Sequence, residues 1–151
     1  MITKFISHRG NLYKKNPERE NSTKYIEEVI NLGYDCEIDL WMDNGRLYLG
    51  HDRPEHVISL SNLLDFKNNL WIHCKNLEVL NYLVENMKHD LNFFWHQNDD
   101  YTLTSKNYIW TFPNKNITKN SVIVDLNHKS KFKDPVFGIC SDNIFYVKQM
   151  Y

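Results

Sequence analysis

The sequence is poor in several features, and each shortage excludes a class of protein. Its 151 residues include only 5 Gly and 4 Pro, and no apolar run approaches the length needed to span a bilayer. So little Gly and Pro excludes collagen-like and low-complexity sequence, while 42% hydrophobic residues exclude a disordered chain. We expect one globular domain, residues 1–151, large enough to bury a core without disulfide bonds.

The chain also has no excess of either charge. It contains 18 Lys+Arg and 19 Asp+Glu, which gives a formal net charge of -1. Proteins that bind nucleic acid or anionic membranes through a broad basic surface carry clustered Lys and Arg in excess of acids. We therefore expect no nucleic-acid partner and no membrane partner, whereas a local phosphate site is compatible with this charge. The lysine-rich segment 129–133 is interpreted as a solvated face.

Cysteines are few and widely spaced. There are three, an odd number, and each lies in an apolar, strand-like run: Cys36, Cys74 and Cys140. This pattern favours buried, reduced thiols over a disulfide framework or a zinc knot. The N-terminal residues lack the apolar core of a signal peptide. The sequence therefore predicts a reducing compartment and a cytoplasmic protein.

Strand-like and helix-like segments alternate in the first half of the chain. Apolar residues recur at helical spacing in residues 25–32, 58–66 and 77–87. The β-prone segments are residues 4–7, 34–42, 46–50, 70–74, 92–95, 108–111, 122–126 and 137–140. Little room for helices remains between the last four of them.

This alternation predicts parallel βαβ units and an α/β fold. Because a full barrel of eight βα units takes about 250 residues, the chain is too short for one. We expect a compact (β/α) TIM-like barrel of seven or eight short strands, with some outer helices reduced or missing. The side without helices is a candidate homo-oligomer interface.

His8 and Arg9 end the first expected strand, at the edge where active-site loops of parallel α/β folds gather. A histidine there moves a proton near neutral pH, and arginine binds a phosphate or carboxylate with two parallel hydrogen bonds. The motif is short, and a solvated loop pair is the competing interpretation.

Glu37 and Asp39 lie two residues apart in the second expected strand, so both carboxylates project from one face of it. Two neighbouring acids in a barrel mouth are costly unless a cation neutralises them. Because Mg²⁺ and Ca²⁺ take oxygen ligands, the pair predicts a site for one of these ions. The competing interpretation is an amphipathic strand whose polar face meets water.

A hairpin returns His51 to this pair of acids. A two-residue turn at Asn44-Gly45 places Asp39 opposite Gly50. Strand alternation alone would direct His51 to the opposite face, so it reaches the carboxylates only if the strand ends or kinks at Gly50. The alternative is a solvent-facing histidine at a strand end.

In combination, these segments resemble the glycerophosphodiester phosphodiesterases, a family of the PI-phospholipase-C-like TIM-barrel superfamily. The matching segments follow the family's order over the first third of the chain: His8-Arg9-Gly10, Pro17, Glu20-Asn21-Ser22, Glu37-Ile38-Asp39, Asp43-Asn44-Gly45 and Gly50-His51-Asp52. The resemblance implies that His8 and His51 are the general acid and base, and that Glu37 and Asp39 are metal ligands. It also implies that Arg9 contacts phosphate and that Glu20 helps to organise the site.

The resemblance is thinner beyond the first third. The family's third strand reads Glu-x-Lys, whereas this chain has His73-Cys74-Lys75. Lys75 is matched to a phosphate-binding lysine, and His73 takes the place of a third carboxylate ligand. An imidazole ligand favours softer ions, so Mn²⁺ or Zn²⁺ become candidates if His73 binds the metal.

Two later segments also resemble the family. Trp110-Thr111 is similar to a late Trp-Thr strand, which makes Trp110 a substrate-binding candidate, and Cys140-Ser141-Asp142 is similar to the closing Thr-Asp segment. His96 follows an aromatic strand and either lines the pocket or is simply solvated.

We therefore predict an enzyme of lipid metabolism, a metal-dependent phosphoric diester hydrolase of the glycerophosphodiester phosphodiesterase type, whose partner is a small-molecule phosphodiester. One of His8 and His51 removes a proton from the nucleophile, and the other protonates the leaving group. The missing third carboxylate keeps open a phosphodiester-binding module without efficient catalysis. A sphingomyelinase-D-like lyase with the same catalytic layout is a further alternative.

Overall fold

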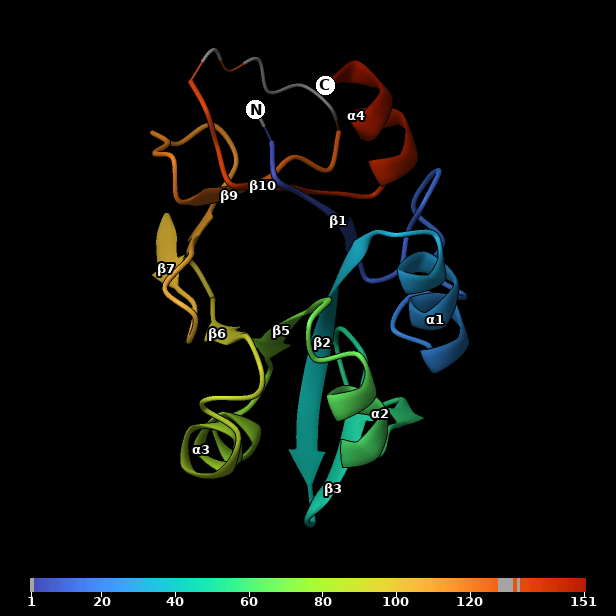
Figure 1. Cartoon of the computed structure of the whole chain (residues 1–151). Coiled ribbons are helices and arrows are strands. Elements are labelled where there is room, and N and C mark those ends of the chain that lie inside the picture. Colours follow the sequence, from blue (N-terminus) through green and yellow to red (C-terminus); the bar gives the residue numbers. More distant parts are fainter. Residues whose placement is uncertain (1, 128–131, 133) are drawn as a thin grey trace.

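The framework of the molecule is one mixed sheet (Figure 1). The computed structural model describes residues 2–127, 132 and 134–151, and among them it contains ten strands. In chain order these are β1 Lys4–His8, β2 Asp35–Asp43, β3 Arg46–Leu49, β4 His56–Val57, β5 Leu70–Cys74, β6 Phe93–Trp95, β7 Tyr101–Leu103, β8 Ile109–Thr111, β9 Ser121–Val124 and β10 Gly138–Ser141.

Parallel pairing connects the strands in the order β6-β5-β2-β1-β10-β9-β8. β7 pairs antiparallel with β8, and β3 and β4 extend the later half of β2 as antiparallel neighbours. The sheet curls until its two ends approach each other (Figure 1). The Ser105 backbone N–H donates to the Phe93 carbonyl at 2.8 Å, and Thr102 Oγ1 donates to the Trp95 carbonyl at 2.7 Å.

Four short helices among the described residues lie on the outer side of the curled sheet (Figure 1). They are α1 Thr23–Asn31, α2 Leu60–Asp65, α3 Leu77–Asn86 and α4 Ile144–Met150. Each begins after a Ser or Asn whose side-chain oxygen accepts a backbone N–H of the first turn. Such caps satisfy donors that the helix itself leaves free.

The expected compact (β/α) TIM-like barrel is wrong. The structure is a curled half-barrel built from a mixed sheet, in which β3, β4 and β7 are antiparallel. Helices separate strands only in the part of the chain before β6, and even there β2, β3 and β4 follow one another directly. Between β6 and β10 no helix lies among the described residues. Between β6 and β8 the physical reason is connection length, because segments 96–100 and 104–108 are shorter than a helical crossover of about ten residues.

Two apolar clusters lie on the two faces of the sheet, one on its outer face and one inside the curl. The larger packs the helices against the outer face, with Ile26, Val29, Leu63 and Leu83 among its fully buried members. The smaller fills the interior of the curl and consists of Ile6, Trp71, Phe94, Trp110, Val122 and Cys140. This inner layer supports the side chains at the C-terminal ends of the parallel strands.

Much of the local structure was predictable. The helix ending before Gly33, the strand over 70–74 and the two-residue turn at Asn44-Gly45 are confirmed, since Asp43 pairs with Arg46. The three cysteines are free and buried, as predicted. The short strands β4 and β7 and the helix α4 were not predicted. Segment 129–133 lies outside the described residues.

Candidate active site

The predicted site residues meet at the C-terminal ends of the parallel strands. There they border a cavity of about 380 Å³, whose lining includes His8, Arg9, Glu37, His51, His73, Lys75 and Trp110, together with His96, Gln97, Phe112 and Val124. Asp39 and Glu20 are buried behind this lining and contact it through Arg9. All nine predicted site residues therefore belong to one constellation.

His8 is held by a buried carboxylate. Its Nδ1 lies 2.7 Å from Asp142 Oδ1, and Asn11 Nδ2 donates to the same oxygen at 2.8 Å. Because the Asp142 carboxylate accepts, His8 Nδ1 carries a proton, and Nε2 lies 3.9 Å from Glu37 Oε2. Burial opposes the charged imidazole, but the hydrogen bond to Asp142 and the charge of Glu37 outweigh it, so the pKa of His8 is raised.

Asp39 is fully buried, and its two oxygens differ in their surroundings. Oδ2 lies 3.0 Å from Arg9 Nε, 3.3 Å from His51 Nδ1 and 3.0 Å from Asn21 Nδ2. Oδ1 has no hydrogen-bond partner of good geometry among the described residues; it faces His73 Nδ1 at 3.1 Å and Lys75 Nζ at 3.5 Å. Burial raises its pKa, but these histidine contacts and Arg9 hold the pKa well below its usual range.

Arg9 connects the acids with His51. Its Nη1 lies 3.3 Å from Glu20 Oε2, and its Nη2 lies 3.2 Å from His51 Nε2. Its backbone N–H donates to Glu37 Oε2 at 3.3 Å, and its φ of 55° lies in the left-handed region. A non-glycine residue in that region is uncommon and is often found at functional sites. The bent backbone turns the guanidinium back over β2.

His51 reaches the carboxylates because the chain turns at Gly50, as the sequence required. Gly50 has a φ of 152°, and its N–H donates to the Asp39 carbonyl at 3.2 Å. Its own carbonyl accepts from Trp41 Nε1 at 2.6 Å. These bonds fix the end of the hairpin and place the His51 ring on the Asp39 side of the sheet.

The orientation of His73 determines which of its ring nitrogens faces the acids. Its Nε2 lies 2.8 Å from the His96 carbonyl, and its ring stacks on Phe94 at 5.3 Å with an interplanar angle of 6°. A carbonyl only accepts, so Nε2 carries the proton and Nδ1 is directed at the carboxylates. Metal-binding histidines are commonly oriented by such a second hydrogen bond.

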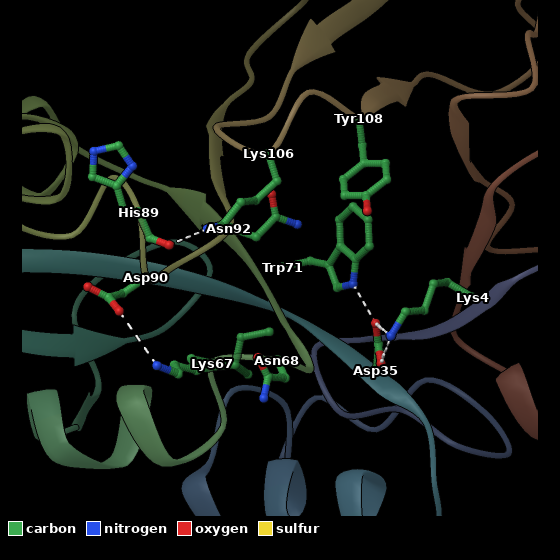
Figure 2. A pocket seen from close by; sticks show the side chains of 11 residues that line it. Lys4, Asp35, Lys67, Asn68, Trp71, His89, Asp90, Asn92, Lys106 and Tyr108 are labelled. Atoms are coloured by element: carbon green, nitrogen blue, oxygen red, sulfur yellow. Dashed lines mark hydrogen bonds and ion pairs between the residues drawn. The ribbon is translucent and has the colours of Figure 1, made fainter.

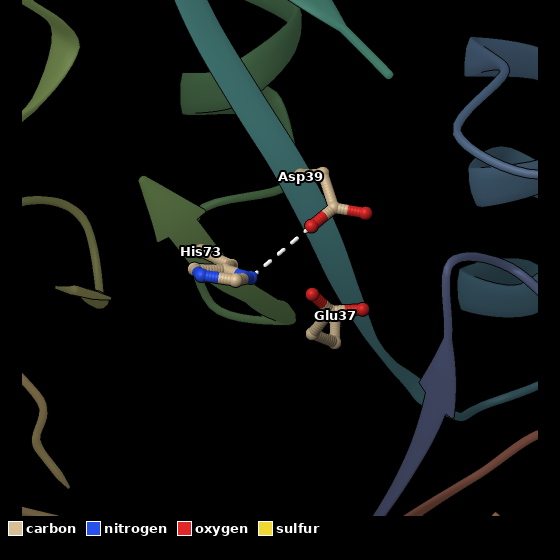
Figure 3. Close-up of side chains that lie close together, drawn as sticks. All are labelled: Glu37, Asp39 and His73. Carbon is tan, nitrogen blue, oxygen red and sulfur yellow. Dashed lines mark ion pairs between the residues drawn. The ribbon is translucent and has the colours of Figure 1, made fainter. Parts of the chain in front are cut away.

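Glu37, Asp39 and His73 form a group that fits a metal ion (Figure 3). One ligand atom from each lies within 4.8 Å of the other two. Burial and the charge of Asp39 raise the pKa of Glu37, which shows that two anionic carboxylates are costly here. Asp39 Oδ1 has no hydrogen-bond partner among the described residues, and both this and the electrostatic cost favour a bound cation, so the residues present fit a divalent metal.

Three residues were given no role from the sequence. Asp142 holds His8, Asn11 bridges Asp142 and Glu20 through 2.8 Å bonds, and Asn21 both donates to and accepts from Asp39. Asp142 could have been found, because it follows the buried strand β10 at the same edge as His8. His96 lines the cavity, and burial together with His73 and Lys75 lowers its pKa.

Comparison of the chain with protein-family models, curated proteins and solved structures returned no match. Among the described residues, no helix is long and apolar enough to cross a membrane.

Proposed function

We propose that the protein is a metal-dependent phosphodiesterase that acts on a glycerophosphodiester-like substrate. The observation that supports this best is the convergence of His8, His51 and Arg9 with three candidate metal ligands at one cavity. The order of the motifs along the chain resembles that of the glycerophosphodiester phosphodiesterases. The proposal rests on the site and not on the architecture, because the half-barrel differs from the barrel that the resemblance implies.

The two histidines supply the proton transfers of the reaction. A hydroxyl of the substrate attacks phosphorus and loses its proton to one imidazole, while the bond from phosphorus to the leaving alcohol breaks and the other imidazole protonates that oxygen. Asp142 fixes His8 from behind, and Asp39 contacts His51 Nδ1 at 3.3 Å. Each ring is thus oriented by a carboxylate. The first product is a cyclic phosphate, which water then opens.

Positive side chains stabilise the charge that develops on phosphate. Arg9 and Lys75 both line the cavity, and both reach Asp39. Glu37, Asp39 and His73 would hold the metal ion. When bound, this ion acts as a Lewis acid toward the phosphoryl oxygen. Anionic transition states are stabilised most by such preorganised groups.

Turnover of bis(p-nitrophenyl) phosphate and glycerophosphocholine with added Mg²⁺, Ca²⁺, Mn²⁺ or Zn²⁺ tests this function. We expect metal-dependent hydrolysis, and we expect His8→Ala and His51→Ala to lower kcat by about 10²- to 10⁴-fold. His56→Ala is the matched control, because His56 is exposed in β4 and outside the cavity.

Unchanged turnover in His8→Ala would contradict the proposal. A folded protein that binds metal but hydrolyses neither substrate with any of the four ions would instead be a phosphodiester-binding module.

A further inference from the structure

A second cavity, of about 420 Å³, opens at the opposite end of the parallel strands (Figure 2). Lys4 and Asp35 begin β1 and β2, and Trp71 lies near the start of β5, so these lining residues are remote from the C-terminal strand ends. The ring of Trp71 lies 6.1 Å from that of Trp110, which lines the candidate active-site cavity. We call the active-site cavity the upper cavity and this second one the lower cavity. The inner apolar cluster thus separates two cavities.

Three ammonium groups surround this lower cavity. Lys4 Nζ lies 2.9 Å from Asp35 Oδ2, and Lys67 Nζ lies 3.5 Å from Asp90 Oδ1. Lys106 Nζ donates to the His89 carbonyl, and within the described residues no carboxylate forms an ion pair with it. Three cations against two carboxylates leave the lining with an excess of positive charge.

Asp35, the buried one of the two carboxylates, has no capacity left for a cationic ligand. Asp35 is buried and accepts from Lys4 at 3.0 Å and from Trp71 Nε1 at 2.9 Å (Figure 2). It also accepts from Asn69 Nδ2 at 3.1 Å. Both of its oxygens are occupied.

Asp90, the other lining carboxylate, is paired with Lys67, and Lys106 is left without a carboxylate partner among the described residues. This uncompensated positive charge favours an anion.

The side-chain amide of Asn92 needs a hydrogen-bond donor. Its side chain lines the cavity beside Lys106 and is only 7% exposed, and its Oδ1 has no hydrogen-bond partner among the described residues (Figure 2). A buried acceptor without a donor is costly, and a ligand hydroxyl that reached it would remove this cost. The cavity thus combines an anion site with a site for a hydroxyl.

We propose that the lower cavity binds a phosphate monoester of a small polyol, with the phosphate between Lys106 and Lys67 and a hydroxyl on Asn92. Lysine binds phosphate as a compact charge, and a volume of about 420 Å³ is within the usual range for small-ligand pockets. This site is distinct from the upper cavity and does not depend on phosphodiesterase activity.

The indole N–H of Trp71 provides a specific reporter. It donates to Asp35 at the edge of the cavity, and the protein has only 4 Trp, so its signal in a ¹H–¹⁵N spectrum can be assigned with Trp71→Phe. Titration with glycerol 3-phosphate should move this signal saturably, and inorganic phosphate should do so at higher concentration, since it lacks the carbon-bound hydroxyls. Glycerol alone should leave the signal unmoved.

Variants then locate the ligand. Lys106→Met and Lys67→Met should each weaken binding by about tenfold, the loss expected for one charged hydrogen bond at a partly exposed site. Lys119→Met, an exposed lysine outside the lining, should have no effect. The dispersion of each variant's spectrum shows directly that it is folded.

Two results would overturn the inference. One is a titration in which the Trp71 signal does not saturate, or in which all the indole signals drift together as they would with ionic strength. The other is saturation that Lys75→Met abolishes and Lys106→Met leaves intact, because the phosphate would then occupy only the upper cavity.

Discussion

At the scale of single residues, the site depends on how two buried carboxylates are compensated. Asp39 is surrounded by Arg9, His51, His73 and Lys75. Among the described residues, the Glu37 carboxylate accepts one hydrogen bond, from the Arg9 N–H, and lies 3.9 Å from His8 Nε2. The pKa of Asp39 is correspondingly lowered, and that of Glu37 is raised by burial and by the charge of Asp39. Asp39 is therefore the fixed anion, and Glu37 is the residue that most needs a metal ion.

The substitution Asp142→Asn tests whether Asp142 positions His8. The neutral amide, unlike the carboxylate, does not stabilise the His8 imidazolium. Its N–H can also donate to His8 Nδ1, which moves the proton of the neutral ring to Nε2. We expect kcat to fall by about 10²-fold and the limb of the pH–rate profile that reports His8 to move to lower pH. The shift follows because the hydrogen bond that His8 donates to Asp142 raises the pKa of His8.

Asp65→Asn is the matched control for this substitution, since Asp65 is exposed on α2. A fall in kcat with an unmoved pH profile would mean that Asp142 only supports the structure.

The substitution His73→Glu tests the choice of metal. Three carboxylates provide a harder, more anionic site than two carboxylates with an imidazole, so the variant should gain affinity for Mg²⁺ and lose affinity for Zn²⁺. We expect each dissociation constant to change by about tenfold or more, measured by calorimetric titration. His56→Glu adds the same charge in β4, away from the cavity. Equal effects of the two substitutions would contradict a ligand role for His73.

At the scale of elements, the end of the β2–β3 hairpin sets the position of His51. A Cβ added at Gly50 would overlap the Arg53 carbonyl oxygen and lie 3.2 Å from Glu55 Cγ. Gly50→Ala should therefore lower the free energy of unfolding by about 3 kcal/mol and reduce turnover by displacing His51.

Gly45→Ala is the control for Gly50→Ala. Gly45 also has a positive φ, of 72°, but nothing lies within 4 Å of its added Cβ. Gly45→Ala should therefore lower the free energy of unfolding by only about 1 kcal/mol. Urea denaturation measures both. Similar losses in the two variants would show that steric overlap at Gly50 is unimportant.

Elements were predictable from the sequence wherever local patterns decide them. Ser22, Ser59 and Asn76 cap helices as their residue types favour, and Asn44 and Gly45 adopt the positive φ of a tight hairpin. β4 and β7 consist of two and three residues, and β7 exists only through its pairing with β8. Neither strand is long enough to show the alternation of apolar and polar residues typical of a strand, so both form through their pairing with neighbouring strands.

The candidate site was largely predictable for the same reason. Parallel strands bring their C-terminal ends to one edge, so His8, Glu37, Asp39 and His73 were bound to meet once their strands were paired. Asn11 and Asn21 lie in the loop after β1, where no periodicity applies, and their contacts with Asp142 and Asp39 depend on the path of that loop. The barrel prediction is wrong because the alternation of the first half does not continue after β6, where segments 96–100 and 104–108 are too short for a helical crossover.

At the scale of the whole molecule, the metal ion and the fold are linked. A ligand that binds only the folded chain raises its stability by RT ln(1 + [L]/Kd), which is about 2.7 kcal/mol at a hundredfold excess over Kd. We expect the preferred ion to raise Tm and a chelator to reverse this rise. In Asp39→Asn the rise should be lost, whereas an unchanged metal response in that variant would exclude Asp39 as a ligand.

The buried ion pair between His8 and Asp142 joins the first strand of the chain to the last, so it contributes to global stability in a pH-dependent way. The pKa of His8 is raised because its contacts with Asp142 and Glu37 outweigh burial, so its contribution is complete below the unfolded pKa of about 6.5 and is lost as the pH rises through the folded pKa. The pKa of Asp142 is lowered because the bond from His8 outweighs burial, so its contribution is present above about pH 3.9 and is lost as the pH falls.

The pair therefore stabilises the protein most at pH values between the titration of Asp142 and that of His8. The substitution His8→Gln tests the loss of stability at the upper, His8 end of this range. With chelator present, the difference in unfolding free energy between wild type and His8→Gln should be larger near about pH 6 than near about pH 9, because only the wild type loses a favourable imidazolium in that interval. Urea titrations at the two pH values measure it, with exposed His56→Gln as the control. A difference that stays constant between the two pH values would mean that Asp142 binds neutral His8, and that the charge on this ring does not help to hold the first and last strands together.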